Sequence, residues 1–287
     1  MLVGKIAGVR IRVNLFFLLL CAAYTALGLG WEILFIFVSV LVHEIGHVVM
    51  ALALGVKVAE IELLPFGGQA KIEDFTGLEP DREIYIALAG PAVSLSLAGI
   101  FYFLRPDMAS SYLPLFININ LFLGIFNLCP ALPLDGGRIM RAFLSAKIGY
   151  KKSTTRAAIL GKIIALGISL YGLYLIYYHQ SGLNYLAVGT LLFWAAHREG
   201  KLLAYAFMRY LINKKRDLAK NGVLPSQQVV SQETTQLKRI LEYTRPTYYL
   251  VIMVVDEGDH LVGMRTEAEV IECFLEKGPS STLRDCY

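Results

Sequence analysis

The chain has 287 residues, of which 56% are hydrophobic, and its mean hydropathy is +0.55. A soluble core could not bury so many apolar side chains, so the composition excludes an ordinary soluble protein and predicts a large surface facing lipid. The formal net charge of +4 is small for this length, and we expect no nucleic-acid partner.

Six apolar segments are long enough to cross about 30 Å of hydrocarbon at 1.5 Å per helical residue. They cover residues 14–30, 33–54, 84–104, 113–132, 157–178 and 183–196. With the N-terminus inside, Arg105 is the only one of 27 lysines and arginines in an outer segment, which predicts two cytosolic termini. Lys5, Arg10 and Arg12 also resemble the start of a signal peptide, but removal of the first helix would invert this bias, so we expect it to be retained.

The distribution of apolar and charged residues along the chain changes after the sixth apolar segment. Residues 1–200 are predicted as a six-span helical membrane domain, 201–222 as a basic amphipathic linker, and 223–287 as a small cytosolic α/β module. In this module we expect strands at 248–255 and 261–264 and a helix at 267–276. The basic linker is either the ordinary inner flank of a membrane protein or a lipid-binding segment.

The four cysteines give no sign of a metal site or a disulfide framework. Cys21, Cys129, Cys273 and Cys286 lack the paired spacing of either, so we expect free thiols, two in the membrane and two in a reducing cytosol.

The apolar segment at 33–54 contains the motif His43-Glu44-Ile-Gly-His47 and no other ionisable side chain. Residues i and i+4 share one face of a helix, so both imidazoles can reach one zinc ion with Glu44 beside it. An acid at the centre of a membrane helix costs roughly 2.5–3.5 kcal/mol on insertion scales. Because packing alone would not justify that cost, the motif predicts a zinc hydrolase that works inside the membrane.

A third ligand is needed, because zinc hydrolases usually hold the metal through three protein ligands and leave one position for water. Asp135 is the candidate, in the run Asn127-x-x-Pro-x-x-Pro-Leu-Asp135-Gly-Gly. The prolines and glycines must break the span at 113–132 so that Asp135 stays at the depth of His43. Broken backbone at that depth must line protein or water, which predicts a water-accessible cavity open toward the cytosol. The alternative is that Asp135 caps a helix that begins near Arg138.

The remaining polar side chains suggest further roles. Glu44 is expected to act as the general base that takes a proton from water and passes it to the leaving amine. Asn127 is the polar side chain nearest the break, and either stabilises the oxyanion or makes a plain helix–helix hydrogen bond. His179 and His197 lie near the predicted membrane surfaces and His260 in the soluble module, so they are poor candidates for the metal.

Residues 58–72 predict a β-hairpin beside the active site, because polar and apolar residues alternate on both sides of a turn at 65–68. The edge of such a hairpin could hold an extended substrate by β-addition. The alternative is a plain connector at the membrane interface.

Three motifs together resemble the site-2 protease family of intramembrane zinc metalloproteases. They are His43-Glu44-x-x-His47, Ala89-Gly-Pro, and Asn127-x-x-Pro-x-x-Pro-Leu-Asp135-Gly, and they span most of residues 33–138. The resemblance implies one zinc ion per chain held by His43, His47 and Asp135, with Glu44 catalytic. The chain departs from the family pattern at Ser94, where many members carry asparagine, and we assign no role to Ser94.

Residues 229–275 resemble a single CBS motif. Such motifs usually pair, which implies self-association, and often bind adenine nucleotides such as ATP. Thr266 is the candidate nucleotide contact, although Glu269 stands where the family usually has an aspartate.

The predicted architecture, six spans followed by one CBS motif, is similar to that of one subgroup of the family. Members of this subgroup release a sigma factor from its membrane-associated pro-form during endospore formation. This similarity implies a pro-sigma factor as substrate, inhibitory membrane proteins as partners, and the bacterial inner membrane or the membrane around the forespore as location. One alternative is a general site-2 protease that cleaves an anti-sigma factor or signal-peptide remnants. An alternative of another class is a CBS-regulated transporter or metal sensor, but the polar ligands lie at one level only and no internal repeat is present.

Overall fold

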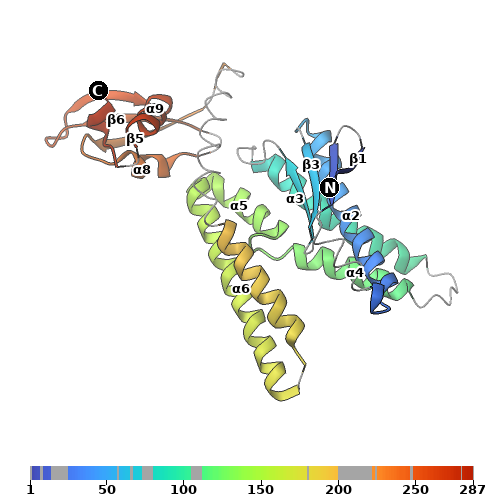
Figure 1. The fold of residues 1–287 in the computed structure, drawn as a ribbon. Helices are drawn as coiled ribbons and strands as arrows, with labels where there is room; N and C mark the ends of the chain where they lie inside the picture. Colours follow the sequence, from blue (N-terminus) through green and yellow to red (C-terminus); the bar gives the residue numbers. More distant parts are fainter. Residues whose placement is uncertain are drawn as a thin grey trace. The chain divides into compact units, whose positions relative to one another are not determined.

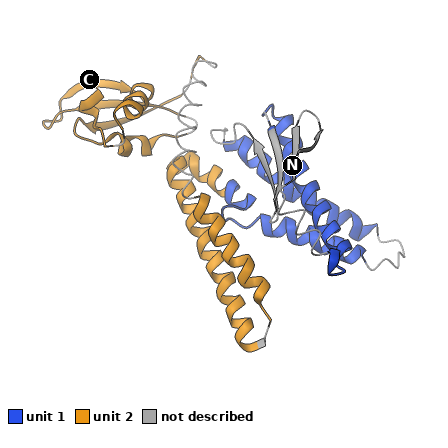
Figure 2. Ribbon diagram, viewed as in Figure 1, with its two compact units in different colours: residues 1–139 blue, residues 140–287 orange. Residues whose placement is uncertain are grey.

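The computed structural model describes two compact units, residues 1–139 and 140–287, which are treated separately (Figure 2). The described residues are 2–6, 9–13, 25–56, 58–64, 67–72, 80–104, 112–179, 181–199, 222–223, 225–245, 248–278 and 280–286. Most of the first predicted span, and nearly all of the predicted linker at 201–222, lie outside these residues.

Three helices form the body of the first unit (Figure 1). They are α2 (Gly30–Ala53), α3 (Pro80–Phe103) and α4 (Leu113–Asn127). Each confirms a helix predicted from an apolar run, but α4 ends at Asn127 rather than at 132. Proline has no N–H group and clashes with the preceding turn, so Pro130 and Pro133 stop the helix early.

Small residues let these helices approach closely. A Cβ at Gly46 of α2 would lie 3.0 Å from the carbonyl oxygen of Ala89 on α3. A Cβ at Gly124 of α4 would lie 2.7 Å from the side chain of Leu95 on α3. Such close backbone contacts are the usual means of packing helices in membranes, where lipid removes the hydrophobic driving force.

A four-stranded sheet accompanies these helices, in the order β1 (Leu2–Ile6), β2 (Val9–Val13), β3 (Val58–Leu64) and β4 (Gly67–Ile72). The antiparallel β3–β4 pair confirms the predicted hairpin, and β4 pairs only with β3 among the described strands. The strands β1 and β2 were not predicted. The basic residues Lys5, Arg10 and Arg12 indicate from sequence the inner flank of a span or the start of a signal peptide, whereas in the structure β2 pairs in parallel with β3.

The helix α5 (Asp135–Ile148) begins in the first unit and continues into the second, where α6 (Tyr150–His179) follows and residues 183–199 are also helical. These last two helices lie side by side (Figure 1). A Cβ at Gly172 would lie 2.6 Å from the backbone nitrogen of Leu186, and a Cβ at Gly189 would lie 2.7 Å from that of Ser169. The helix α6 begins seven residues before the predicted 157, because its charged first turns escaped a prediction based on hydropathy.

The C-terminal part of the second unit is a small α/β module. Its elements are β5 (Ser226–Gln232), α8 (Leu237–Ile240), η1 (Leu241–Tyr243), β6 (Tyr249–Val255), β7 (Leu261–Thr266), α9 (Glu267–Lys277) and η2 (Leu283–Cys286). The strands β6 and β7 and the helix α9 confirm the prediction, whereas β5 was missed. The sheet order is β5-β6-β7, parallel then antiparallel, and apolar residues of β6 and α9 share one core.

The module is attached to the first turn of α6. Tyr150 is 4% exposed and belongs to the same apolar core as Leu237 and Leu250 of the module. The ammonium group of Lys151 donates to the carboxylate of Glu242 at 2.5 Å. Just before them, Gly149 has φ +83°, and a Cβ there would lie 3.0 Å from the carbonyl oxygen of Thr244.

The prediction of free thiols is wrong for two cysteines. Cys273 of α9 and Cys286 of η2 form a disulfide, with 5.6 Å between their Cα atoms. Their spacing of 13 residues has no recognised pattern, and only the fold of η2 back onto α9 brings the two side chains together. Cys129 is free, and Cys21 lies outside the described residues.

Three of the described helices are long and apolar enough to span a membrane: α2, α3 and α6. The helix α4 is apolar but shorter. Near the end of α6, Tyr174, Tyr177 and Tyr178 are exposed, as is typical of aromatic residues at a membrane–water interface. The six-span topology with cytosolic termini stays a prediction.

Candidate metal centre

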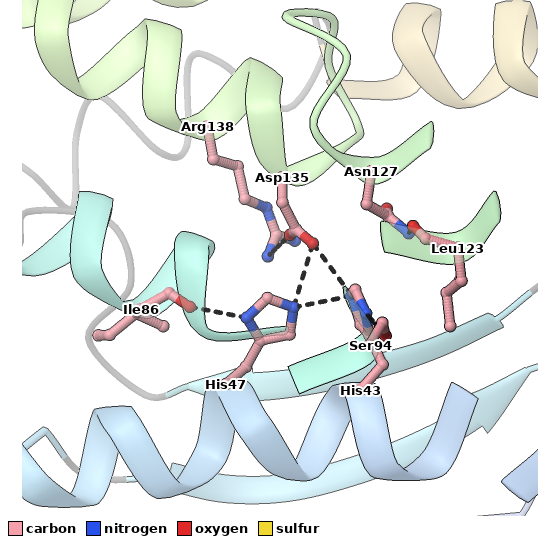
Figure 3. Close-up of polar contacts among 8 residues, drawn as sticks. All are labelled: His43, His47, Ile86, Ser94, Leu123, Asn127, Asp135 and Arg138. Carbon is pink, nitrogen blue, oxygen red and sulfur yellow. Dashed lines mark hydrogen bonds and ion pairs between the residues drawn. The ribbon is translucent and has the colours of Figure 1, made fainter. Parts of the chain in front are cut away.

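Three buried side chains converge in the first unit (Figure 3). His43 and His47 lie one turn apart on α2 and are 3% and 4% exposed, and Asp135 at the start of α5 is 5% exposed. The Nε2 atom of each histidine is 3.1 Å from Oδ2 of Asp135, and the two Nε2 atoms are 3.2 Å apart. The ligand atoms of all three residues lie within 4.8 Å of one another, which is close enough to hold one metal ion.

The predicted break in the span brings Asp135 to this place. After α4 ends at Asn127, residues 128–134 form a bend, and the carbonyl of Leu134 accepts the backbone N–H groups of Gly137 and Arg138 as α5 begins. Side chains at Gly136 and Gly137 would overlap the backbone of the bend, so both positions require glycine. The carboxylate of Asp135 points at the two histidines, which favours the ligand interpretation over the helix cap.

The helix α3 orients both imidazoles. Nδ1 of His47 lies 2.7 Å from the carbonyl oxygen of Ile86. A carbonyl only accepts hydrogen bonds, so Nδ1 carries the proton and Nε2 is left with a free lone pair for a metal. Nδ1 of His43 lies 2.9 Å from the hydroxyl of Ser94. Between these two contacts, a Cβ at Gly90 would overlap His47 and would lie 2.7 Å from Nε2 of His43.

This donor set fits zinc. Two imidazole nitrogens and one carboxylate are the ligands of many catalytic zinc sites, and the arrangement leaves a coordination position open. Gly90 provides space beside both Nε2 atoms, where any side chain would intrude. Arg138 contributes a nearby positive charge, with a guanidinium nitrogen 3.6 Å from Oδ1 of Asp135, while Oδ2 faces the histidines.

The other predicted residues lie as follows. Glu44 is half-buried on α2 and close enough to His47 to act on it electrostatically. The amide nitrogen of Asn127 donates to the carbonyl of Leu123 at 2.9 Å, so this group bonds within its own helix (Figure 3). Thr266 caps α9 in the C-terminal module, where its hydroxyl accepts from the N–H of Glu269 and its own N–H donates to the Glu269 carboxylate.

A supporting role for Ile86, Gly90 and Ser94 was not predicted from the sequence, although Gly90 lies in the Ala89-Gly-Pro motif. They are spaced four apart on α3 and therefore share the face that meets α2, which is the signal that could have revealed them. Across the described residues, His43, His47 and Asp135 are the only group of three potential metal ligands within reach of one ion.

Comparisons with known proteins agree with this geometry. The sequence model of peptidase family M50 matches residues 31–109 and 105–171. A zinc metalloprotease of Methanocaldococcus jannaschii is 41% identical over 181 residues, which are 59% of this chain and 52% of that protein. Stage IV sporulation protein FB of Bacillus subtilis is 27% identical over 146 residues, which are 50% of this chain and 51% of that protein. The chain therefore spans about half the length of these curated relatives.

The solved structure of a site-2 protease from Methanocaldococcus jannaschii is 34% identical, with a TM-score of 0.57. The match covers 70% of this chain and 94% of that one. The segment matched by the M50 family also contains all three converging side chains, His43, His47 and Asp135. The chain belongs to peptidase family M50, the site-2 protease family.

Proposed function

We propose that the protein is an intramembrane zinc metalloprotease that hydrolyses a peptide bond in a membrane-associated protein. The observation that carries this proposal is the convergence of His43, His47 and Asp135, all buried, between apolar helices. A zinc ion, when bound, supplies the Lewis acidity that hydrolysis of an amide requires. Among the described residues, potential metal ligands converge at one place only, next to the half-buried Glu44, which favours this activity over a transporter or metal sensor.

The side chains of the chain itself account for proton transfer and orientation. Glu44 follows His43 directly, and its carboxylate would take the proton of the attacking water and deliver it to the departing amine. The hydrogen bonds that the two imidazoles make with α3 hold each ring in one orientation during the reaction. Asn127 could reach the oxyanion only after its amide leaves the carbonyl of Leu123, so its oxyanion role has weaker support.

The strand β4 is the proposed place where the substrate is held. A helical substrate must become extended before its amide can be attacked, and an unpaired strand edge can bind an extended segment through backbone hydrogen bonds. Among the described strands β4 has β3 on one side only, and it packs against α2, the helix that carries His43 and His47.

The test is a paired assay in membranes with a single-span reporter protein as substrate. The native chain should cleave the reporter and contain one zinc ion, and Glu44→Gln should keep zinc and lose cleavage. Glu32→Gln, at the other end of α2, is the matched control and should behave like the native chain. Cleavage by Glu44→Gln would contradict the role of Glu44, and absence of zinc from the native protein would overturn the proposal.

A pro-sigma factor is the more specific substrate that we propose, with a role in endospore formation. Its support is the similarity to Stage IV sporulation protein FB. Co-expression of the native chain with a membrane-associated pro-sigma factor, an anti-sigma factor or a signal-peptide remnant would separate the candidates. Cleavage of only the anti-sigma factor or the remnant would favour a general site-2 protease.

Self-association through the C-terminal module is a further proposal. The strand register places Val230, Met253 and Met264 on the sheet face away from the core, and Val230 and Met264 are 63% and 58% exposed. If a second copy covers this face, Met264→Glu should lower the crosslinked dimer fraction. An adenine nucleotide at Thr266 has less support, because the capping box already engages that residue. If addition of ATP leaves the melting temperature of the protein unchanged, the module does not bind this nucleotide.

A further inference from the structure

The helix α3 contacts the two histidines in different ways: one imidazole bonds to the backbone of α3 and the other to a side chain. Ile86, Gly90 and Ser94 are spaced four residues apart, so they form one stripe on the face of α3 that meets α2. The imidazole of His47 donates to the backbone carbonyl of Ile86, a group that every residue at position 86 would have. The imidazole of His43 is hydrogen-bonded to the side-chain hydroxyl of Ser94, so the orientation of this ring depends on which residue stands at position 94.

Ser94 has no exposed surface. A hydroxyl buried without a hydrogen-bond partner destabilises the fold, because the group loses its contact with water and gains nothing in return. The partner of this hydroxyl within the described residues is Nδ1 of His43, at 2.9 Å. Ser94 is thus a buried polar group whose placement is explained by the metal ligand it contacts.

The bond has a direct consequence for metal binding. A neutral imidazole carries one proton, and a hydrogen bond at one ring nitrogen selects which nitrogen keeps the lone pair. When Nε2 of His43 binds a metal, the ring proton lies on Nδ1, and the Ser94 oxygen 2.9 Å away is placed to accept it while Nε2 faces Oδ2 of Asp135 at 3.1 Å. Without that acceptor, the ring can rotate or take the other tautomer, and either change removes one ligand.

We propose that Ser94 is a positioning residue that holds His43 through Nδ1 with Nε2 directed at the zinc. This inference rests on the proposed function of the same site. Outer-shell partners of metal ligands typically change metal affinity by about 10–100-fold when removed. Ser94→Ala should therefore weaken zinc binding by roughly that factor and lower cleavage with it.

The experiment compares full-length proteins in detergent: the native chain, Ser94→Ala, Ser94→Thr and Ser96→Ala. Ser96 lies on the same helix but is exposed, so it is the matched control. Zinc affinity is measured by competition with a chromophoric chelator, and the visible absorption of the cobalt-substituted proteins reports ligand geometry. Thermal unfolding of the metal-free proteins tests whether each variant still folds.

We expect weaker zinc binding and an altered cobalt spectrum for Ser94→Ala only, with Ser94→Thr close to native and all metal-free melting temperatures alike. Equal zinc affinity of Ser94→Ala and Ser96→Ala would overturn the inference and leave the proposed function intact. Equal losses in Ser94→Ala and Ser94→Thr would also overturn it, since packing rather than the hydroxyl would then matter. No zinc bound by the native chain would instead defeat the proposed function itself.

Discussion

Gly90 of α3 faces Nε2 of His43 so closely that a Cβ at this glycine would lie 2.7 Å from the nitrogen. The same Cβ would overlap the imidazole of His47. Gly90→Ala is therefore expected to displace both rings and abolish zinc binding and cleavage. Gly99→Ala in the same helix, where nothing lies within 4 Å, should keep both and gain up to about 1 kcal/mol of stability. Metal content of the two purified variants checks this, and zinc in Gly90→Ala would contradict it.

Asp135→Asn distinguishes a metal ligand from a helix cap. Asparagine and aspartate cap helices about equally well, so a capping role predicts little change in stability or metal content. A ligand role predicts loss of most of the zinc, because the amide is neutral and binds cations far more weakly. We expect less than about one tenth of native zinc content, measured by atomic absorption, with normal helical content by circular dichroism. Zinc at the native level would support the cap.

The contact between Lys151 and Glu242 should make attachment of the C-terminal module dependent on pH. The hydrogen bond from Lys151 holds the pKa of Glu242 below its ordinary value of 4.5. A lowered carboxyl pKa stabilises the attached state fully above pH 4.5, and the stabilisation disappears as the pH falls through the folded pKa. Because the pair is partly exposed, its contribution is about 0.5–1 kcal/mol.

Hydrogen exchange of the first turn of α6 at pH 7 and below pH 4.5 measures this attachment. After each rate is divided by the rate of an unstructured peptide at the same pH, the native chain should be less protected at the lower pH, whereas Glu242→Gln should be weakly protected at both. Identical pH dependence in the native chain and Glu242→Gln would show that another group is responsible.

The disulfide between Cys273 and Cys286 should stabilise the module. Closing a loop of this length stabilises a fold by about 3 kcal/mol in the chain-entropy model. Cys273→Ser, like reduction of the native chain, should lower the unfolding temperature of the module without altering zinc content. Cys129→Ser is the control, since that thiol is free. Thiol counting under denaturing, non-reducing conditions decides whether the bond is present.

Gln69→Pro tests the edge of β4. Proline removes a backbone N–H group and is poorly accommodated in a paired strand, so the edge should no longer accept an extended substrate. We expect cleavage to be lost while zinc content stays normal. Full cleavage by this variant would show that β3 and β4 only connect α2 to α3.

The sequence predicted the elements that carry a strong local signal. Long apolar runs marked α2 and α3, and the spacing of His43 and His47 placed both on one helix face. The prolines after Asn127 predicted a break that keeps Asp135 near His43, although the predicted span ran five residues past the end of α4. In each case the information is local: periodicity, or residues that cannot continue a helix.

The parts that escaped prediction depend on contacts between distant segments. The strand β5 (Ser226–Gln232) is rich in serine and glutamine and gains its partners only through parallel pairing with β6. The bond between Ser94 and His43 joins residues 51 apart, and no spacing rule relates them. The cysteine pair likewise needs a geometry that sequence spacing does not specify.

The helix α5 imposes a constraint on length in addition to the residues that it requires at its start. It begins at Asp135 and ends at Ile148. Gly149, with its positive φ, follows, and the next residue, Tyr150, packs in the core of the C-terminal module. Each helical residue turns the backbone by about 100° and advances it by 1.5 Å. One residue inserted into α5 would rotate Asp135 by that angle relative to Gly149, and one deleted would rotate it the opposite way. The number of residues between Gly137 and Gly149, rather than their identity, therefore sets the direction of Asp135 about the axis of α5 relative to Gly149.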